Sequence, residues 1–280
     1  MKYVAARSLN EAVGAVEKGA VVLAGGTDLL VGWERKSHPA SVCDIGGVPG
    51  LRGIEERGDS VWVGALTTHA EVAASPFLGA CAAVLREAAA SVGAVQIRNR
   101  GTVGGNVVNA SPAGDVLTAL YVLEATVELV GPEGQRNVPI ESFVLGPRRT
   151  DLRKGELVTG FWFRKPGPEV QGYTKLGLRS AQAIAVVSLA ARLALNEGVV
   201  THAVFALGSV APTPVRARKA EGVLLGKRVE GSTVREVADE LSAAARPIDD
   251  VRASAEYRRA MAGVLFELFV ERQGLLERTR

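Results

Sequence analysis

Two separate glycine pairs constrain this chain more than any other feature of its sequence. Gly25-Gly26 lies in "VLAGGTDLL", between a short apolar run and a second apolar segment. Gly104-Gly105 lies in "IRNRGTVGGNVVNASPAGD" at 97–115. Glycine has no Cβ, so it can adopt positive φ and let backbone N–H groups approach a ligand closely. Successive N–H groups that point one way form an anion site, to which a helix N-terminus adds its dipole.

Each glycine pair alone is more simply explained as a turn, because turns are the commonest use of glycine. Two such loops, each flanked by Thr, Asp, Asn or Ser, favour a ligand instead. Each hydrogen bond to a charged phosphate contributes about 1.5–3 kcal/mol, so a few of them could hold a diphosphate without any Lys or Arg. We expect a side chain introduced at Gly104 to occupy the space of a phosphate oxygen and to leave the fold intact.

Composition and charge exclude several other classes of function. The 280 residues are 47% hydrophobic, which is typical of a globular protein. The 33 Lys and Arg are nearly balanced by 30 Asp and Glu, and the sequence has no basic stripe interleaved with aromatic residues, so the charge pattern does not indicate nucleic-acid binding. Cys43 and Cys81 form no CxxC motif, which argues against an iron–sulfur or zinc site in this chain. Two isolated thiols suit the reducing cytoplasm. The charged N-terminal segment is unlike a signal peptide, and the longest apolar run is too short for a bilayer.

The familiar nucleotide and catalytic motifs are absent. The sequence has no G-x-G-x-x-G after a strand, no P-loop and no G-x-S-x-G. The three histidines are far apart and show no metal-ligand spacing, so we predict no metal site.

The pattern of apolar residues predicts alternating helices and strands. Ser8 and Glu11 form a capping box, and residues 1–54 read as strand–helix–strand–helix–strand. A hairpin follows at 54–65, and Thr68 could cap a short helix. Further helices are predicted at 78–90, 115–123, 216–225, 232–245 and 253–273, and strands at 126–130, 135–140, 156–163, 172–178, 183–195 and 201–210. The Pro/Gly-rich stretch at 164–169 places a boundary near 165–172.

Six motifs, in order, give the chain a specific resemblance. They are "AGGTDLL", "GALTTHAE" (64–71), "IRNRGTVGGNVVNASPAGD", "YTKLG" (173–177), "VAPTPVRA" (210–217) and "RPIDDVRASAEYRR" (246–259). Together they resemble the FAD-binding medium subunit of molybdenum hydroxylases, the family of the carbon monoxide dehydrogenase medium subunit and the xanthine dehydrogenase flavin domain. The likeness extends from Tyr3 to about Glu271.

The resemblance implies an α+β protein with a two-subdomain FAD-binding fold of the vanillyl-alcohol-oxidase type and a smaller α+β C-terminal domain. The FAD-binding domain would comprise 1–170, with subdomains at about 1–54 and 55–170. The C-terminal domain would comprise 171–280. In that family FAD lies extended, with its pyrophosphate on the two glycine loops.

The resemblance also implies the residues that contact FAD. The first loop would contribute Val22, Leu23, Ala24, Gly25, Gly26, Thr27, Asp28 and Leu29. The second loop would contribute Thr102, Gly104, Gly105 and Asn106, and the positions of Val92, Asp115, Val158, Lys175 and Ile184 match further contacts. A lysine cation near the flavin pyrimidine edge would stabilise the anionic reduced flavin. Ala183 departs from the family, which usually has an acidic residue there. His69 is either a polar contact near the cofactor or a first-turn helix residue satisfied by local hydrogen bonds.

The function that the resemblance implies is electron transfer. The chain would pass electrons from [2Fe–2S] clusters of a small partner subunit through FAD to an external acceptor. Substrate oxidation would take place at a molybdenum cofactor in a large partner subunit, and this chain would contain no catalytic residue. Two alternatives are a free-standing flavin-dependent oxidoreductase of the same fold and a nucleotide-binding interaction module without a redox role.

Overall fold

The computed structural model describes residues 1–33, 38–179 and 182–276. The chain forms two compact units, and neither is one continuous segment. The first unit comprises Met1–Val72, Ala94–Ala110 and Glu124–Arg164, and the second comprises Ala73–Gly93, Ser111–Leu123 and Lys165–Arg280.

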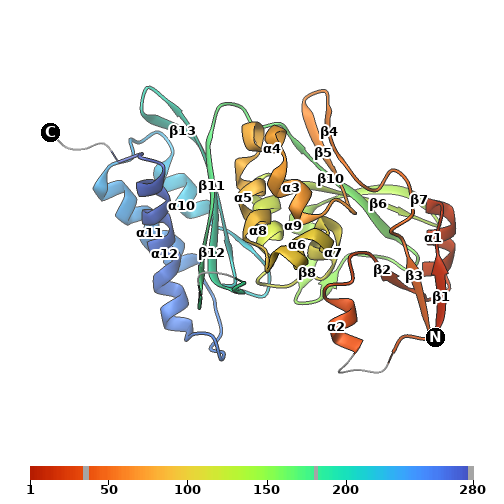
Figure 1. Ribbon diagram of the computed structural model, residues 1–280. Helices are drawn as coiled ribbons and strands as arrows, with labels where there is room; N and C mark the ends of the chain where they lie inside the picture. Colours follow the sequence, from red (N-terminus) through yellow and green to blue (C-terminus); the bar gives the residue numbers. More distant parts are fainter. Residues whose placement is uncertain (34–37, 180–181, 277–280) are drawn as a thin grey trace. The chain divides into compact units, whose positions relative to one another are not determined.

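A small parallel sheet begins the first unit, with strand order β1-β3-β2 (Figure 1). Its strands are β1 (Lys2–Ala5), β2 (Val21–Leu23) and β3 (Ser41–Asp44), and its helices are α1 (Leu9–Glu17) and α2 (Leu29–Trp33). The hydroxyl of Ser8 accepts the N–H of Glu11, and Gly19 follows the helix with φ +89°. The predicted strand–helix–strand–helix–strand order is confirmed.

An antiparallel sheet with strand order β4-β5-β10-β6-β7 completes the core of the first unit. Its strands are β4 (Ile54–Arg57), β5 (Ser60–Gly64), β6 (Thr126–Gly131), β7 (Gly134–Pro139) and β10 (Leu157–Arg164). The predicted hairpin turns at Gly58, where φ is +59°. Around the sheet lie α6 (Val95–Arg100), α7 (Val103–Val108), α9 (Ile140–Phe143), and the hairpin of β8 (Val144–Gly146) and β9 (Arg149–Thr150).

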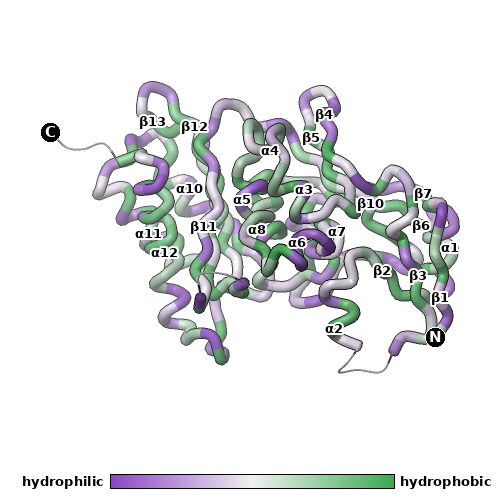
Figure 2. Tube along the Cα trace, viewed as in Figure 1, coloured by the Kyte–Doolittle hydropathy of each residue, from purple (hydrophilic) through white to green (hydrophobic). Residues whose placement is uncertain are grey.

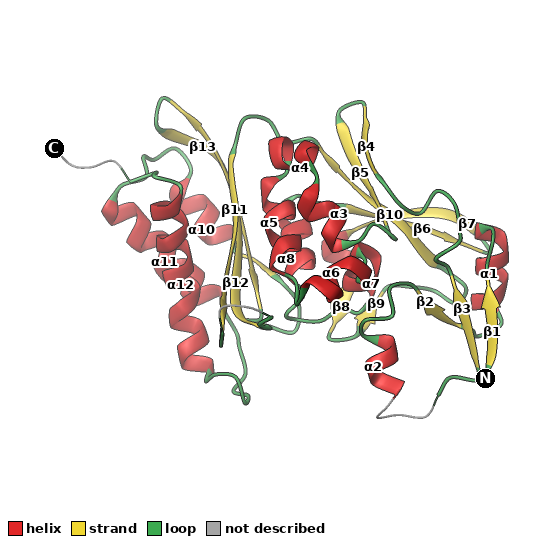
Figure 3. Ribbon diagram, viewed as in Figure 1, coloured by secondary structure: helices red, strands yellow, loops and turns green. Residues whose placement is uncertain are grey.

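The second unit is a four-stranded antiparallel sheet between two helical layers (Figure 3). Its strands are β11 (Val170–Gly177), β12 (Ala185–Asn196), β13 (Val199–Gly208) and β14 (Val215–Arg216). The helices α10 (Arg218–Leu224), α11 (Gly231–Ala244) and α12 (Ala255–Arg272) cover one face, and α5 (Ala83–Ser91) and α8 (Asp115–Val122) cover the other. Strands β12 and β13 are mainly hydrophobic (Figure 2), and Phe205, Phe266 and Phe269 are buried with them.

The predicted single helix at 78–90 is wrong, because the chain breaks at Ala82 (φ −140°, ψ 53°) into α4 (Pro76–Cys81) and α5. The side chain of Gln171 fills the break. Its Nε2 donates to the carbonyl of Cys81 at 3.0 Å, and its Oε1 accepts the N–H of Val84 at 3.5 Å. These bonds satisfy backbone groups that the helix ends leave without partners. The short helix α3 (His69–Ala74) follows Thr68, whose hydroxyl accepts the N–H of Glu71 as predicted.

Candidate FAD-binding site

The first glycine loop connects β2 to α2 and exposes backbone donors. Gly26 has φ +75°, a left-handed conformation that glycine adopts without strain. Gly25, Gly26 and Thr27 are half-buried, and Asp28 is exposed. Within the described part of the chain, no acceptor receives the N–H groups of these four residues. They can therefore bind an anion without giving up a hydrogen bond of the fold.

Glycine at position 25 allows this loop to touch the segment that precedes the second glycine pair. A Cβ on Gly25 would lie 1.9 Å from the carbonyl oxygen of Arg100, which is a severe overlap with the backbone. A Cβ on Gly101 would lie 3.3 Å from Oγ1 of Thr27 and 3.1 Å from Cδ2 of His69. The two glycine motifs, far apart in sequence, thus meet in the first unit.

The second glycine pair lies in the first turn of α7, where Thr102 is the N-cap. Here the N–H groups already have protein acceptors. Val103 donates to the carbonyl of Thr67 (2.9 Å), Gly104 to that of Ala65 (2.8 Å), and Gly105 to Oγ1 of Thr102 (3.0 Å). The two glycine loops therefore differ in the donors that they offer.

The effect expected of a side chain at Gly104 is corrected by the structure. A Cβ at this position would lie 2.8 Å from both the Cβ and the carbonyl oxygen of Ala65. The added atoms would disturb the packing of α7 on the loop after β5. A substitution at Gly104 therefore does not test ligand space alone.

Arg148 lies beside the first glycine loop, although no sequence pattern points to it. It occupies the tight turn between β8 and β9 with φ +57°, and its N–H donates to the carbonyl of Ala110 (3.1 Å). Its Nη1 lies 3.4 Å from Oδ2 of Asp28 and 3.2 Å from Oδ1 of Asn109. The carboxylate of Asp28, which follows the glycines directly, thereby has a counter-charge. No sequence pattern marked an arginine in "LGPRRT" as a neighbour of the first loop.

His69 lies at the start of α3 and is 3% exposed. The backbone N–H of His69 donates to the carbonyl of Gly101, whereas the buried ring nitrogen Nδ1 has no partner among the described residues. Burial, and secondarily the charge of Arg98, lower the pKa of His69 to about 4. The imidazole is neutral at physiological pH. Local hydrogen bonds thus leave Nδ1 of the ring unsatisfied among the described residues, which differs from the simpler of the two interpretations.

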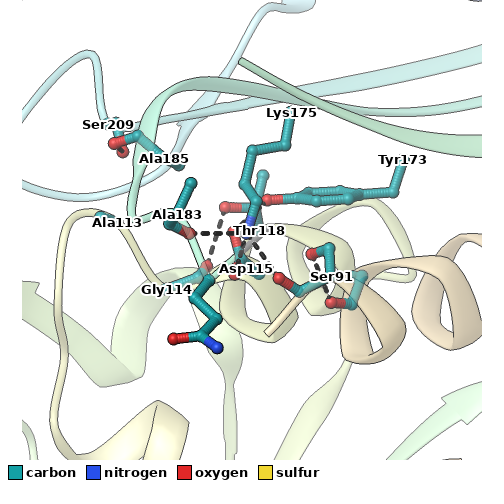
Figure 4. Close-up of polar contacts among 12 residues, drawn as sticks. Ser91, Ala113, Gly114, Asp115, Thr118, Tyr173, Lys175, Ala183, Ala185 and Ser209 are labelled. Carbon is teal, nitrogen blue, oxygen red and sulfur yellow. Dashed lines mark hydrogen bonds and ion pairs between the residues drawn. The ribbon is translucent and has the colours of Figure 1, made fainter. Parts of the chain in front are cut away.

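A second group of predicted contacts forms a buried ion pair in the second unit (Figure 4). Nζ of Lys175 lies 2.9 Å from Oδ2 of Asp115, and the two side chains are 10% and 8% exposed. The ammonium also donates to the carbonyls of Ser91 (2.7 Å) and Ala183 (3.2 Å). Burial raises the pKa of Asp115, and the neighbouring Lys175 opposes that rise.

The other predicted contacts lie in both units. In the first unit, Val22 and Leu23 belong to β2, Leu29 begins α2, Asn106 lies in α7, and Val158 is buried in β10. In the second unit, Val92 follows α5 as its C-cap, and Ile184 precedes β12 with 63% of its surface exposed.

Comparison with known proteins decides the family. Residues 1–163 match the family described as FAD binding domain in molybdopterin dehydrogenase, and residues 173–273 match the CO dehydrogenase flavoprotein C-terminal domain. The chain belongs to the flavoprotein subunits of the molybdopterin dehydrogenases. The predicted resemblance is confirmed, as are FAD as the cofactor and the class of oxidoreductase subunit.

Relatives of this flavoprotein subunit match it along most of their length. The carbon monoxide dehydrogenase medium chain of Hydrogenophaga pseudoflava is 36% identical over 94% of this chain and 93% of its own. The glyceraldehyde dehydrogenase medium chain of Sulfolobus acidocaldarius is 32% identical over 94% of each chain. A chain of reconstituted CO dehydrogenase from Oligotropha carboxidovorans superposes with a TM-score of 0.94 at 32% identity, over 98% of both chains. The predicted FAD-binding fold with a smaller C-terminal domain is confirmed.

None of the helices in the described part of this flavoprotein subunit is both long and apolar enough to cross a membrane. Among the described residues there is also no group of three or more His, Cys, Asp or Glu side chains placed to hold a metal ion.

Proposed function

We propose that this chain is the electron-transfer subunit of a cytoplasmic molybdenum hydroxylase. It assembles with a large molybdenum-cofactor subunit and a small [2Fe–2S] subunit, and electrons from the clusters leave through this chain to an external acceptor. FAD, when bound, supplies the redox chemistry, and the protein supplies its binding and electrostatic environment. The domain division at about residue 170, with subdomains at 1–54 and 55–170, belongs to the same proposal.

The observation that carries the proposal is the set of N–H groups on the first glycine loop for which the described part of the chain offers no acceptor. Gly25, Gly26, Thr27 and Asp28 present these groups at a half-exposed loop, which fits a diphosphate. The N–H groups of Gly104 and Gly105 are already bonded, so the second pair supports the first loop through the segment that precedes it. We propose that the first loop donates most of the hydrogen bonds to the diphosphate.

The buried pair of Lys175 and Asp115 supports the cofactor contacts proposed for the second unit. An ammonium with 10% exposure acts in a low dielectric, where its field is stronger than in water. Its carbonyl and carboxylate partners fix its position before any ligand arrives. In this proposal Lys175 stabilises negative charge on the bound cofactor, and Val92, Val158 and Ile184 supply apolar contacts.

The names of the relatives suggest that the substrate is chosen in another subunit. One relative is named for carbon monoxide dehydrogenase and another for glyceraldehyde dehydrogenase, although both medium chains are similar to this one over 94% of its length. Two such different substrates with similar medium chains are consistent with a conserved electron-transfer task.

Reconstitution with FAD tests the proposal in two steps. The purified chain should take up FAD in a one-to-one ratio and show a flavin absorption spectrum. The reduced small subunit, added without air, should then bleach that spectrum. A chain that remains colourless with FAD would contradict the FAD-binding proposal. Turnover of a simple substrate by the isolated flavoprotein, without bleaching by the small subunit, would favour a free-standing oxidoreductase.

A further inference from the structure

The phenol of Tyr173 contacts the same carboxylate as Lys175. Its hydroxyl donates to Oδ1 of Asp115 at 2.6 Å, while Lys175 binds Oδ2 at 2.9 Å (Figure 4). Tyr173 and Lys175 are two residues apart on β11, so their side chains leave the same face of the strand. The two oxygens of the carboxylate thus bind different donors, and both of these donors come from one strand.

Lys175 depends on its protein partners for its position. An ammonium has three N–H bonds, and three acceptors from the described residues lie within hydrogen-bond distance: Ser91, Asp115 and Ala183. The acceptor from Asp115 is the charged one. If the carboxylate turned or took up a proton, the ammonium would lose its counter-charge while it remained buried.

The ends of two helices favour this arrangement of charges. Asp115 is the first residue of α8, where the helix dipole stabilises an anion. Ser91 is the last residue of α5, where a cation beside its carbonyl is favoured. The anion of the pair therefore lies at a helix N-terminus and the cation beside a helix C-terminus, which are the placements that the helix dipoles stabilise.

Among the described residues, the other groups named around Tyr173 are polar, and Lys175 is the one cation among them. From α5, the carboxylate of Glu87 accepts the N–H of Tyr173 (2.8 Å), and Ser91 is close to the phenol. From β12, Ser188 also approaches the phenol. Gly208 on β13 makes room for this cluster, because a Cβ there would lie 2.4 Å from Oγ of Ser188 and 2.5 Å from Oγ1 of Thr118 on α8.

We propose that Tyr173 is a positioning residue, which holds the Asp115 carboxylate ionised and oriented so that Lys175 stays in place for the cofactor. The inference rests on the proposed function, since Asp115 and Lys175 are predicted contacts of FAD. A bond from a hydroxyl to a carboxylate stabilises the ionised form. Burial raises the pKa of Asp115, whereas Lys175 and Tyr173 oppose the rise. Without the hydroxyl, Asp115 keeps its proton to higher pH.

The decisive variant is Tyr173→Phe in the full chain, with Tyr257→Phe as the matched control. Tyr257 lies on α12 with 46% exposure, so its hydroxyl can be removed without touching the cluster. FAD dissociation constants are measured between about pH 5 and pH 8. We expect Tyr173→Phe to bind FAD nearly as the wild type does at the upper end, where Asp115 is ionised in both proteins, and to bind FAD about tenfold more weakly toward the lower end, where Asp115 of the variant takes up a proton first. Tyr257→Phe should match the wild type throughout.

The pH profile separates positioning from a structural role. A loss of affinity that is constant with pH, or no loss, would overturn the inference. A wild-type chain that fails to bind FAD would instead overturn the proposed function, and the two failures are therefore distinguishable. The double variant Tyr173→Phe/Asp115→Asn should bind FAD as weakly as Asp115→Asn alone, because without the carboxylate the phenol has nothing to position.

If Tyr173→Phe does not fold, Asp115→Asn tests the same contact from the other side. Burial and the Asp115 carboxylate hold the pKa of Tyr173 well above its usual value. Removing the carboxylate charge should move the absorbance titration of this buried phenol to lower pH. An unchanged titration would overturn the inference.

Discussion

Nη1 of Arg148 lies 3.4 Å from Oδ2 of Asp28 and 3.2 Å from Oδ1 of Asn109, so it joins the first glycine loop to the residue after α7. A carboxylate directly after Gly25-Gly26 would repel a bound diphosphate. Arg148 offsets that charge, and its 69% exposed side chain has further N–H groups to offer. The acidic residue in the loop is therefore compatible with an anionic ligand.

Replacing Arg148 with Ala should weaken FAD binding about two- to fivefold at low salt, because the Asp28 charge is then uncompensated. The effect should shrink as salt screens the exposed charges. Asp28→Asn should leave the affinity unchanged or increase it. Fluorescence titration with FAD at low and high salt measures both variants. Arg153→Ala is the control, since Arg153 is 62% exposed and pairs with Glu133 instead. Equal affinities for Arg148→Ala and the wild type at low salt would contradict the assignment.

Replacing Gly25 with Ala should destabilise the first unit, because its Cβ would overlap the carbonyl oxygen of Arg100. A backbone shift is then required, and we expect a loss of at least about 2 kcal/mol in the free energy of unfolding. Gly32→Ala is the matched control, because no atom of the described residues lies within 4 Å of its added Cβ. Denaturant unfolding of both variants measures the difference. Equal stability of the two variants would show that the glycine loops do not meet as described.

Local chemistry made the secondary structure predictable, whereas residues brought together by the fold were not. Ser8 with Glu11, and Gly58 in its hairpin, act on neighbours within a few residues, so the local sequence predicts their roles. The break at Ala82 was missed because the side chain that fills it, Gln171, belongs to a distant strand. An alanine-rich segment alone favours one continuous helix.

The same limit explains the candidate site. The sequence predicts ligand space at Gly104, but the neighbour of Gly104 is Ala65, which only the folded chain brings close. Arg148 contacts Asp28 across a long sequence separation. Tyr173 had one sequence signal, because it alternates with Lys175 along a strand, and this spacing could have placed both on one face.

His69 should make the stability of the chain depend on pH. Its pKa falls from the ordinary 6.5 to about 4 in the folded state, so between these values the unfolded chain binds the proton more readily. The contribution of the neutral His69 to the free energy of unfolding is therefore fully present above pH 6.5. It is lost as pH falls toward 4, by about 3 kcal/mol in total. Unfolding free energies across this range should show the loss for the wild type.

The variant His69→Gln removes the titrating group and should flatten this part of the profile. His202→Gln is the control, because His202 has a 46% exposed side chain in the other unit. The difference between each variant and the wild type isolates one histidine from the carboxylates that titrate in the same range. A profile for His69→Gln parallel to that of the wild type would refute the neutral buried imidazole.

Lys175→Met should cost about 3–5 kcal/mol near neutral pH, because it leaves the carboxylate of Asp115 buried without its counter-charge. The penalty should fall in acid. Burial already raises the pKa of Asp115, and loss of Lys175 raises it further, so the folded variant binds a proton more readily than the unfolded chain. Its stability relative to wild type is therefore recovered as pH falls through the raised pKa. The double variant with Asp115→Asn should be more stable near neutral pH than the sum of the single losses implies. Urea unfolding of the chain without FAD, at acidic and neutral pH, measures these differences. Equal penalties at both pH values would mean that Asp115 is not the ionised partner of Lys175.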